Sequence, residues 1–257
     1  MLGPVQHAAW QRYELKYLVD EHLAARVRAV CERFMKLDPY SDSQSDREYP
    51  IHSVYFDSSD RVLAQSVVDR CSNRYKLRVR RYRGLYENAA ELPTYFEVKR
   101  KNYGVVHKTR TRLTSQDSER LLETGFDSFY PPDAEPEIVE RLSEFLRLRS
   151  RLRAQPVIAV FYTREAYENR DDGVRISFDR NLHYGVMDDD GERTRELWWP
   201  VPLSGIILEI KFTNTYPFWI RDLIGRSELA RRGVCKYLIC SQASRGIPFG
   251  RRELKLL

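Results

Sequence analysis

Three short segments of the chain place a glutamate and a lysine two residues apart with one apolar residue between them. They are Glu14-Leu15-Lys16, Glu97-Val98-Lys99 and Glu209-Ile210-Lys211. Successive side chains of a β-strand point to opposite faces, so in a strand each glutamate would share a face with its lysine. Such a pair is either a solvated ion pair or a place where a metal and a phosphate are held together.

Other segments with the same alternation carry mainly cations. KLRVRRY, VVHKTRTR and VRISFD each alternate charged or polar residues with apolar ones. An arginine fork grips phosphate oxygens in pairs, whereas a lysine supplies a compact charge. These patterns predict a phosphate-binding set of Lys16, Lys76, Arg78, Arg80, Lys99, Lys108, Arg110, Arg175 and Lys211. Within it, the arginines Arg78, Arg80 and Arg175 are expected to orient phosphates and the lysines to neutralise them.

The carboxylates among these cations need a reason, because a bare carboxylate repels polyphosphate. A carboxylate that holds Mg²⁺ or Mn²⁺ attracts it, since the metal takes its remaining ligands from water and phosphate. Glu14, Glu97 and Glu209 are therefore the candidate metal ligands. Asp57 and Asp179 could be secondary ligands, but orienting neighbouring arginines is the favoured role for both.

Composition places the chain among soluble, folded proteins. It has 257 residues, of which 42% are hydrophobic and 12% aromatic, which suits one large domain over residues 1–257. The net charge of +6 and a pI of about 9.1 favour an anionic partner, although solubility alone would explain a modest excess. No signal peptide or apolar run long enough to cross a membrane is present, so a cytoplasmic protein with reduced thiols is expected.

Several common sites are excluded by motif. The chain has neither G-x-x-x-x-G-K-[ST] nor G-x-G-x-x-G, so the usual glycine-rich phosphate loops have no support. Its four cysteines form no C-x-x-C pair, which argues against a zinc site. Nucleic-acid binding is also disfavoured, because a groove-reading surface would not thread carboxylates through its cations.

Hydrophobic periodicity predicts alternating strands and amphipathic helices. Strands are expected over 11–18, 51–57, 75–83, 94–101, 105–112, 157–168, 173–179 and 204–213. Helices are expected over 20–37, 115–124, 135–152, 217–229 and 236–244, with a loop around DPYSDSQSD and a turn through Asn102 and Gly104. The apolar strand faces can pack on helices, so the charged faces must look to bulk water or into a closed barrel. Because these faces are dominated by long cations, we expect a hydrated, positively charged tunnel.

In this order, several segments resemble one known family. RYELKY, SVYFDSSD, KLRVRRY, YFEVKRK, VHKTR, FYTREAY, VRISFD, LEIKF, PFWI and CKY, spread over residues 11–243, resemble the VTC domain. This is the polyphosphate polymerase domain of the vacuolar transporter chaperone complex and its bacterial relatives, a branch of the triphosphate tunnel metalloenzymes. The resemblance implies an α+β fold, a closed antiparallel eight-stranded β-barrel with helices packed outside.

The resemblance also implies roles for particular residues. Glu209 would bind the divalent metal, and Lys236 would join the phosphate-binding set. The bore is expected to carry Lys16, Arg78, Arg80, Glu97, Lys99, Arg175, Glu209 and Lys211. Two positions depart from the patterns: Cys235 stands where the C-terminal Ser-Lys-Phe-like motif has serine, and Arg12 stands where the wider superfamily often has an acid.

The function expected from this resemblance is polyphosphate synthesis. A nucleoside triphosphate would lie in the tunnel with Mn²⁺ or Mg²⁺, and the end of a polyphosphate chain would attack its γ-phosphorus. Arg78, Arg80, Lys99, Arg175 and Lys211 would stabilise the charge that is transferred. The alternatives are a metal-dependent tri- or polyphosphatase and a non-catalytic module that binds polyphosphate or inositol pyrophosphate. A monomer is expected, and a separate membrane partner protein stays open.

Overall fold

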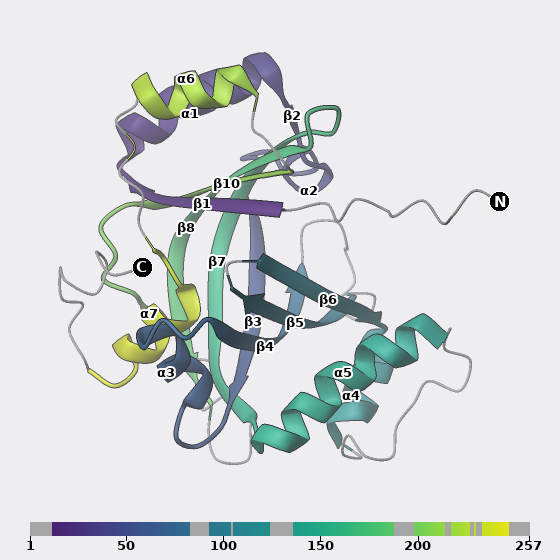
Figure 1. Ribbon diagram of the computed structural model, residues 1–257. Helices are drawn as coiled ribbons and strands as arrows, with labels where there is room; N and C mark the ends of the chain where they lie inside the picture. Colours follow the sequence, from purple (N-terminus) through teal and green to yellow (C-terminus); the bar gives the residue numbers. More distant parts are fainter. Residues whose placement is uncertain are drawn as a thin grey trace.

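One continuous antiparallel sheet is the frame of the molecule (Figure 1). The computed structural model describes residues 12–82, 93–103, 105–123, 136–187, 198–213, 217–226, 229 and 233–246. Eight strands follow one another in the spatial order β1-β10-β8-β7-β3-β4-β5-β6, while the short β2 and β9 pair with β7 and β8. Their bounds are β1 Arg12–Val19, β2 Lys36–Leu37, β3 Tyr49–Asp57, β4 Asn73–Tyr82, β5 Thr94–Asn102, β6 Val105–Leu113, β7 Gln155–Asn169, β8 Val174–Val186, β9 Trp199–Pro200 and β10 Ile206–Thr213.

All eight strands predicted from alternation are present, with shifted ends. The largest difference is β8, which runs to Val186 rather than 179. Its extension includes Asn181, whose φ is positive, and lies beside a register shift between Phe161 and Thr163 of β7. Irregularities of this kind bend a strand and increase its twist. A second shift between Tyr55 and Phe56 of β3 adds to the curl of the sheet.

Six of the seven described helices occupy three places around this sheet, and the short α2 lies beside β2 (Figure 1). Their bounds are α1 Glu21–Phe34, α2 Pro39–Asp42, α3 Val62–Val68, α4 Ser115–Glu123, α5 Pro136–Leu152, α6 Phe218–Arg226 and α7 Lys236–Ala243. In Figure 1, α1 and α6 cover β1 and β10, α4 and α5 lie below β4 and β5, and α3 and α7 lie together at one end. Sequence analysis missed α3 and read the segment containing α2 as loop, because both helices are shorter than the two or three turns that periodicity needs.

The apolar faces of the strands form the cores beneath these helices. Under α1 and α6, Val27 and Ile220 pack with Leu208 and Ile210 of β10. Under α4 and α5, a second core includes Leu121, Leu142 and Phe145 with Leu77 and Phe96 from the strands. The predicted packing of helices outside the sheet is confirmed for these four helices. The opposite, charged face of the sheet is thereby left on the inner side of the curl.

The sheet is open rather than closed. Within the described residues, β1 and β6 are the two ends of the strand order, and no backbone pairing joins them. The closed barrel expected from sequence is therefore corrected to a curled, open eight-stranded sheet. Some Cα atoms of β1 and β6 still approach within 8 Å. Side chains span the gap, since Lys99 Nζ of β5 lies 2.6 Å from Glu14 Oε2 of β1.

Three sequence-based expectations concern the chain as a whole. No helix of the described residues has the length and apolar character needed to cross a membrane. The four cysteines, all within the described residues, form no disulfide with one another. The single domain over residues 1–257 stays a prediction, because both ends of the chain, like Gly104 of the predicted turn, lie outside the described residues.

Candidate functional site: a cation-lined cavity

The inner face of the curled sheet encloses a cavity of about 480 Å³. Eleven lysines and arginines line it, and the only carboxylates among its described lining residues are Glu14 and Glu209. The cations are Lys16, Lys76, Arg78, Arg80, Lys99, Lys108, Arg110, Arg164, Arg175, Lys211 and Lys236. All ten predicted phosphate-binding residues are in this set; strand alternation accounts for nine of them, and Lys236 reaches the cavity from α7. Their roles in binding stay predictions.

Glu209 lies at the centre of one group of cations. It projects from β10 and is only 4% exposed. Lys16 Nζ lies 2.7 Å from its Oε1, and Lys211 Nζ lies 2.7 Å from its Oε2. Burial raises the pKa of Glu209, but Lys16 and Lys211 outweigh burial and hold it well below the usual range. The carboxylate is therefore ionised, as a metal ligand must be.

Glu14 joins this group from the neighbouring strand. Antiparallel pairing of β1 with β10 sets Glu14 opposite Lys211 and Lys16 opposite Glu209, so each Glu-x-Lys pair is complemented by the other. Lys16 Nζ lies 2.9 Å from Glu14 Oε1. Burial and the Glu209 charge raise the pKa of Glu14, but Lys16 and Lys99 bring it down to about 2.

Glu97, the third predicted metal ligand, lies apart from these two. It is 1% exposed and does not line the cavity. Arg78 Nε lies 2.5 Å from its Oε2, and Lys108 Nζ lies 2.5 Å from its Oε1. Arg110 Nε approaches Oε1 at 3.4 Å. Glu97 therefore lies beneath the cations as their counter-charge, whereas the sequence predicted a metal ligand whose side chain lies in the bore.

Arg164 is the lining cation that sequence analysis missed. It projects from β7 and is held by Asp179 of β8, with Nε at 2.6 Å from Oδ1 and Nη2 at 2.8 Å from Oδ2. Lys236 also donates to Asp179. Asp179 therefore orients cations, as the sequence predicted. The signal for Arg164 was present in FYTREAY, because Tyr162 and Arg164 are two residues apart and both line the cavity.

Asp57 has a different role from the one predicted. Its carboxylate is fully buried and accepts hydrogen bonds from the backbone N–H groups of Leu63 and Ala64, at 2.9 Å each. Tyr237 of α7 also donates its hydroxyl proton to Asp57. Asp57 thus anchors α3 and α7 rather than orienting an arginine.

Arg175 is positioned by a residue outside the sheet. Its Nη2 lies 2.6 Å from Asp38 Oδ2, and Asp38 also caps α2 by accepting from the backbone N–H of Ser41. The short helix α2 therefore fixes the acid that holds this arginine. Sequence analysis could not connect the two, because Arg175 and Asp38 are 137 residues apart.

Arg80 has hydroxyl partners in place of a carboxylate. It is 5% exposed, and its Nε and Nη1 donate to Ser53 Oγ at 3.0 Å and to Tyr82 Oη at 3.4 Å. No ion pair joins it to a carboxylate of the described residues. Burial raises the pKa of Tyr82, but Arg80, together with Arg110 and Lys108, outweighs burial and lowers that pKa to about 7. An anion in the cavity would meet in Arg80 a guanidinium whose direct partners are hydroxyl groups.

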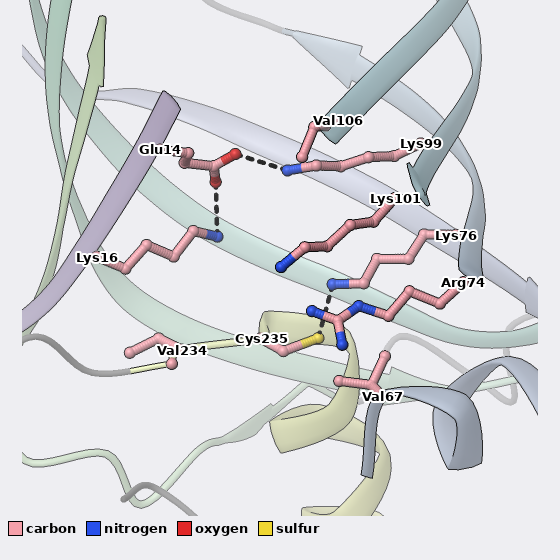
Figure 2. A pocket seen from close by; sticks show the side chains of 11 residues that line it. Glu14, Lys16, Val67, Arg74, Lys76, Lys99, Lys101, Val106, Val234 and Cys235 are labelled. Atoms are coloured by element: carbon pink, nitrogen blue, oxygen red, sulfur yellow. Dashed lines mark hydrogen bonds and ion pairs between the residues drawn. The ribbon is translucent and has the colours of Figure 1, made fainter. Parts of the chain in front are cut away.

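A smaller hollow of about 160 Å³ adjoins the cavity at its basic end (Figure 2). It shares Glu14, Lys16, Lys76, Lys99, Val106 and Cys235 with the cavity and adds Arg74 and Lys101. Figure 2 shows Arg74, Lys76 and Lys101 extending from one side toward Cys235 and Lys16. Arg74, Lys76, Arg78 and Arg80 alternate along β4, so one strand carries a row of cations from the hollow into the cavity.

A divalent metal fits part of this arrangement. Among the described residues, no three His, Cys, Asp or Glu side chains converge as a metal site would require. Glu14 and Glu209 are both ionised and both contact Lys16, which places two carboxylates near each other. Mg²⁺ commonly uses one or two carboxylates and takes its other ligands from water and phosphate. Glu14 and Glu209 fit such a metal, whereas Glu97, enclosed by cations, does not.

A family model for the VTC domain matches residues 11–244 of the chain. The chain therefore belongs to the VTC domain family, and the resemblance found in its sequence is confirmed. No curated protein matches the chain.

Solved structures with a similar fold are distant in sequence. A candidate adenylate cyclase from Bacillus halodurans is 13% identical, with a TM-score of 0.47, and the match covers 86% of this chain and 92% of that one. A candidate adenylyl cyclase from Hippeastrum, whose dominant activity is given as triphosphatase, is 14% identical with a TM-score of 0.48, covering 91% and 96%. A candidate adenylate cyclase from Vibrio parahaemolyticus is 12% identical with a TM-score of 0.47, covering 90% and 98%.

Proposed function

We propose that this protein is a polyphosphate polymerase that transfers the γ-phosphate of a nucleoside triphosphate to a growing polyphosphate chain. The observation that carries the proposal is the cavity lining, in which eleven cations accompany only two carboxylates among the described residues. Such a surface suits a long, densely charged anion better than a single small phosphate. Membership of the VTC domain family supports the same substrate class.

The cations would act by position and charge. Phosphoryl transfer needs in-line placement of the two phosphates and stabilisation of the transferred charge more than covalent help from the protein. Arg80 and Arg78 would grip phosphate oxygens, while Lys211 and Lys16 would neutralise them. A terminal oxygen of the chain forms the new bond to the γ-phosphorus as the bond to the bridging oxygen of the diphosphate breaks. No general base is required, because the attacking phosphate is already anionic.

The acidic pair would have a separate part in this scheme. Glu209 and Glu14 are the residues that would hold Mn²⁺ or Mg²⁺ beside the phosphates. Such an ion, when bound, would withdraw charge from the phosphate oxygens. Lys16 keeps the two carboxylates ionised and close together without the ion, since it contacts both.

The test is a product analysis. Purified protein is incubated with ATP and Mn²⁺, and ADP, free phosphate and long-chain polyphosphate are measured separately. ADP with chain product is expected. ADP with only free phosphate would instead indicate a hydrolase, and binding without turnover would indicate a polyphosphate-binding module. Glu209→Gln is the matched variant: it should abolish turnover and retain much of the polyphosphate affinity, because it removes one charge and no cation.

A further inference from the structure

Cys235 and Lys76 face each other where the cavity meets the smaller hollow (Figure 2). Lys76 projects from β4, Cys235 immediately precedes α7, and Lys76 Nζ lies 2.9 Å from Cys235 Sγ. Both residues line the cavity as well as the hollow. A small molecule that enters the space proposed for phosphate can therefore reach the sulfur, although the residue is only 6% exposed.

The contact has no counterpart at the other buried cysteines. Burial raises the pKa of Cys31 and of Cys240, so both are protonated thiols. Burial also raises the pKa of Cys235, but Lys76, with smaller contributions from a backbone hydrogen bond at Leu238 and from Lys16, outweighs burial and lowers it. A thiolate is the nucleophilic form of cysteine.

Lys76 in turn depends on the sulfur for its anionic partner. No ion pair joins Lys76 to a carboxylate of the described residues, whereas Lys99 and Lys16 both contact Glu14. The Lys76–Cys235 contact is thus an ammonium–sulfur pair inside a cavity otherwise lined by cations that carboxylates or hydroxyls hold.

We propose that Cys235 is a modification site for small oxidants of the peroxide class, activated by its contact with Lys76. The sulfur attacks one peroxide oxygen, so that an S–O bond forms as the O–O bond breaks. Sulfur is oxidised by two electrons and the peroxide is reduced by two, and the hydroxide that leaves takes up a proton to become water. The product is a sulfenic acid, which thiols can reduce.

Oxidation and phosphate binding should exclude each other at this place. The added oxygen would stand beside Lys76, in the 160 Å³ hollow where a phosphate would bind. A bound phosphate chain would draw Lys76 away from the sulfur and cover it. This consequence rests on the proposed function, whereas the reaction of Cys235 with peroxide does not.

The first experiment counts thiols without any ligand. The full-length protein is exposed to hydrogen peroxide, unfolded and alkylated, and the thiol remaining at each cysteine is measured by mass spectrometry. We expect Cys235 to be lost before Cys71, which is exposed and so reports plain accessibility. Loss of Cys71 while Cys235 keeps its thiol would overturn the proposal.

Two variants, each of which removes one positive charge, test whether the contact with Lys76 activates Cys235. Lys76→Gln should slow the oxidation of Cys235 by about tenfold, since the loss of the neighbouring cation raises the pKa of the thiol and lowers its thiolate fraction. Lys101→Gln removes a cation from the same hollow and keeps the Lys76–Cys235 contact, so it should leave the rate within about twofold. Equal slowing in both variants would overturn the role of Lys76. If Lys76→Gln does not fold, the pH dependence of the oxidation rate is measured in the chain without substitutions. A pH midpoint for Cys235 that is no lower than the midpoint for Cys71 would also overturn the role of Lys76.

Tripolyphosphate then separates this proposal from the proposed function. Protection of Cys235 by tripolyphosphate supports both. Oxidation of Cys235 without protection supports the modification site and counts against phosphate binding in the cavity. After peroxide treatment, the chain without substitutions should bind tripolyphosphate about tenfold more weakly than before treatment. This is the order expected for one lost charge-assisted contact. Cys235→Ser should show no change between treated and untreated protein.

Discussion

Glu97→Gln should destabilise the protein strongly, because Glu97 is the buried counter-charge beneath the cations of the cavity. The substitution keeps the size of the side chain and removes its charge. Three cations lose their counter-charge at once, because Arg78 and Lys108 lie 2.5 Å from the Glu97 oxygens and Arg110 lies 3.4 Å from one of them. Arg78 is affected most, since its side chain is 17% exposed.

The size of the effect follows from burial. Removing one partner of a buried ion pair costs about 3–5 kcal/mol, because the remaining charge stays buried without compensation. We expect the lower end, about 3 kcal/mol, for two reasons. The glutamine oxygen can still accept from Arg78, and Lys108 and Arg110, each with 37% of its side chain exposed, can turn toward water. A loss of about 3 kcal/mol corresponds to a melting temperature roughly 6–12 °C lower for a protein of this size.

The assay is thermal unfolding followed by circular dichroism at low salt, with and without tripolyphosphate. The anion should restore part of the lost stability, because it supplies negative charge to the same cations and binds only the folded state. Glu137→Gln is the control, since Glu137 forms an exposed pair with Arg141 on α5 and should change stability by less than about 0.5 kcal/mol. A melting temperature of Glu97→Gln equal to that of the control would refute the reasoning.

Three further predictions concern the affinity for phosphate and the stability of the fold. Arg78→Ala combined with Arg80→Ala should weaken tripolyphosphate binding about 100-fold and flatten its salt dependence, since two charged contacts are lost. Titration at two salt concentrations measures the affinity and its salt dependence, and an unchanged salt slope would contradict this prediction. Tripolyphosphate affinity should fall as the pH rises through about 8, because burial lowers the pKa of Lys99 and of Lys108 to about 8 and the neutral amines no longer attract phosphate. Calorimetry below and above this pH measures the affinity, and a constant affinity would count against phosphate binding by these two lysines. Asp57→Asn should cost about 2 kcal/mol in urea unfolding, because the amide cannot accept all the hydrogen bonds that anchor α3 and α7; an unchanged midpoint would show that the anchor is dispensable.

The sequence by itself determined the faces of the strands. Side-chain alternation is local, because each residue of a strand points away from the one before it. This rule placed Lys76, Arg78 and Arg80 of β4 on one side and Leu77 and Val79 on the other, as the structure shows. The same rule brought every predicted phosphate-binding residue of the strands to the cavity wall, whereas Lys236 reaches it from α7.

Only the tertiary structure decided which charged residues meet. Glu14 and Glu209 come together because β1 pairs with β10 in one register, whereas Glu97 lies on β5 and is covered by Arg78, Lys108 and Arg110. The three Glu-x-Lys segments look alike in sequence, so alternation could not tell the carboxylates that line the cavity from the one beneath it. Pairing between distant strands makes that distinction.

Long-range contacts also decided whether the sheet closes and which carboxylates pair with its arginines. Alternation does not state whether β1 and β6 pair, and the register shifts that curl the sheet have no marker in local periodicity. Asp38 meets Arg175 across 137 residues of chain. A strand's sequence thus fixes the face on which each side chain lies. The partners on that face depend on strand order, register and curvature, which arise only when the whole chain packs.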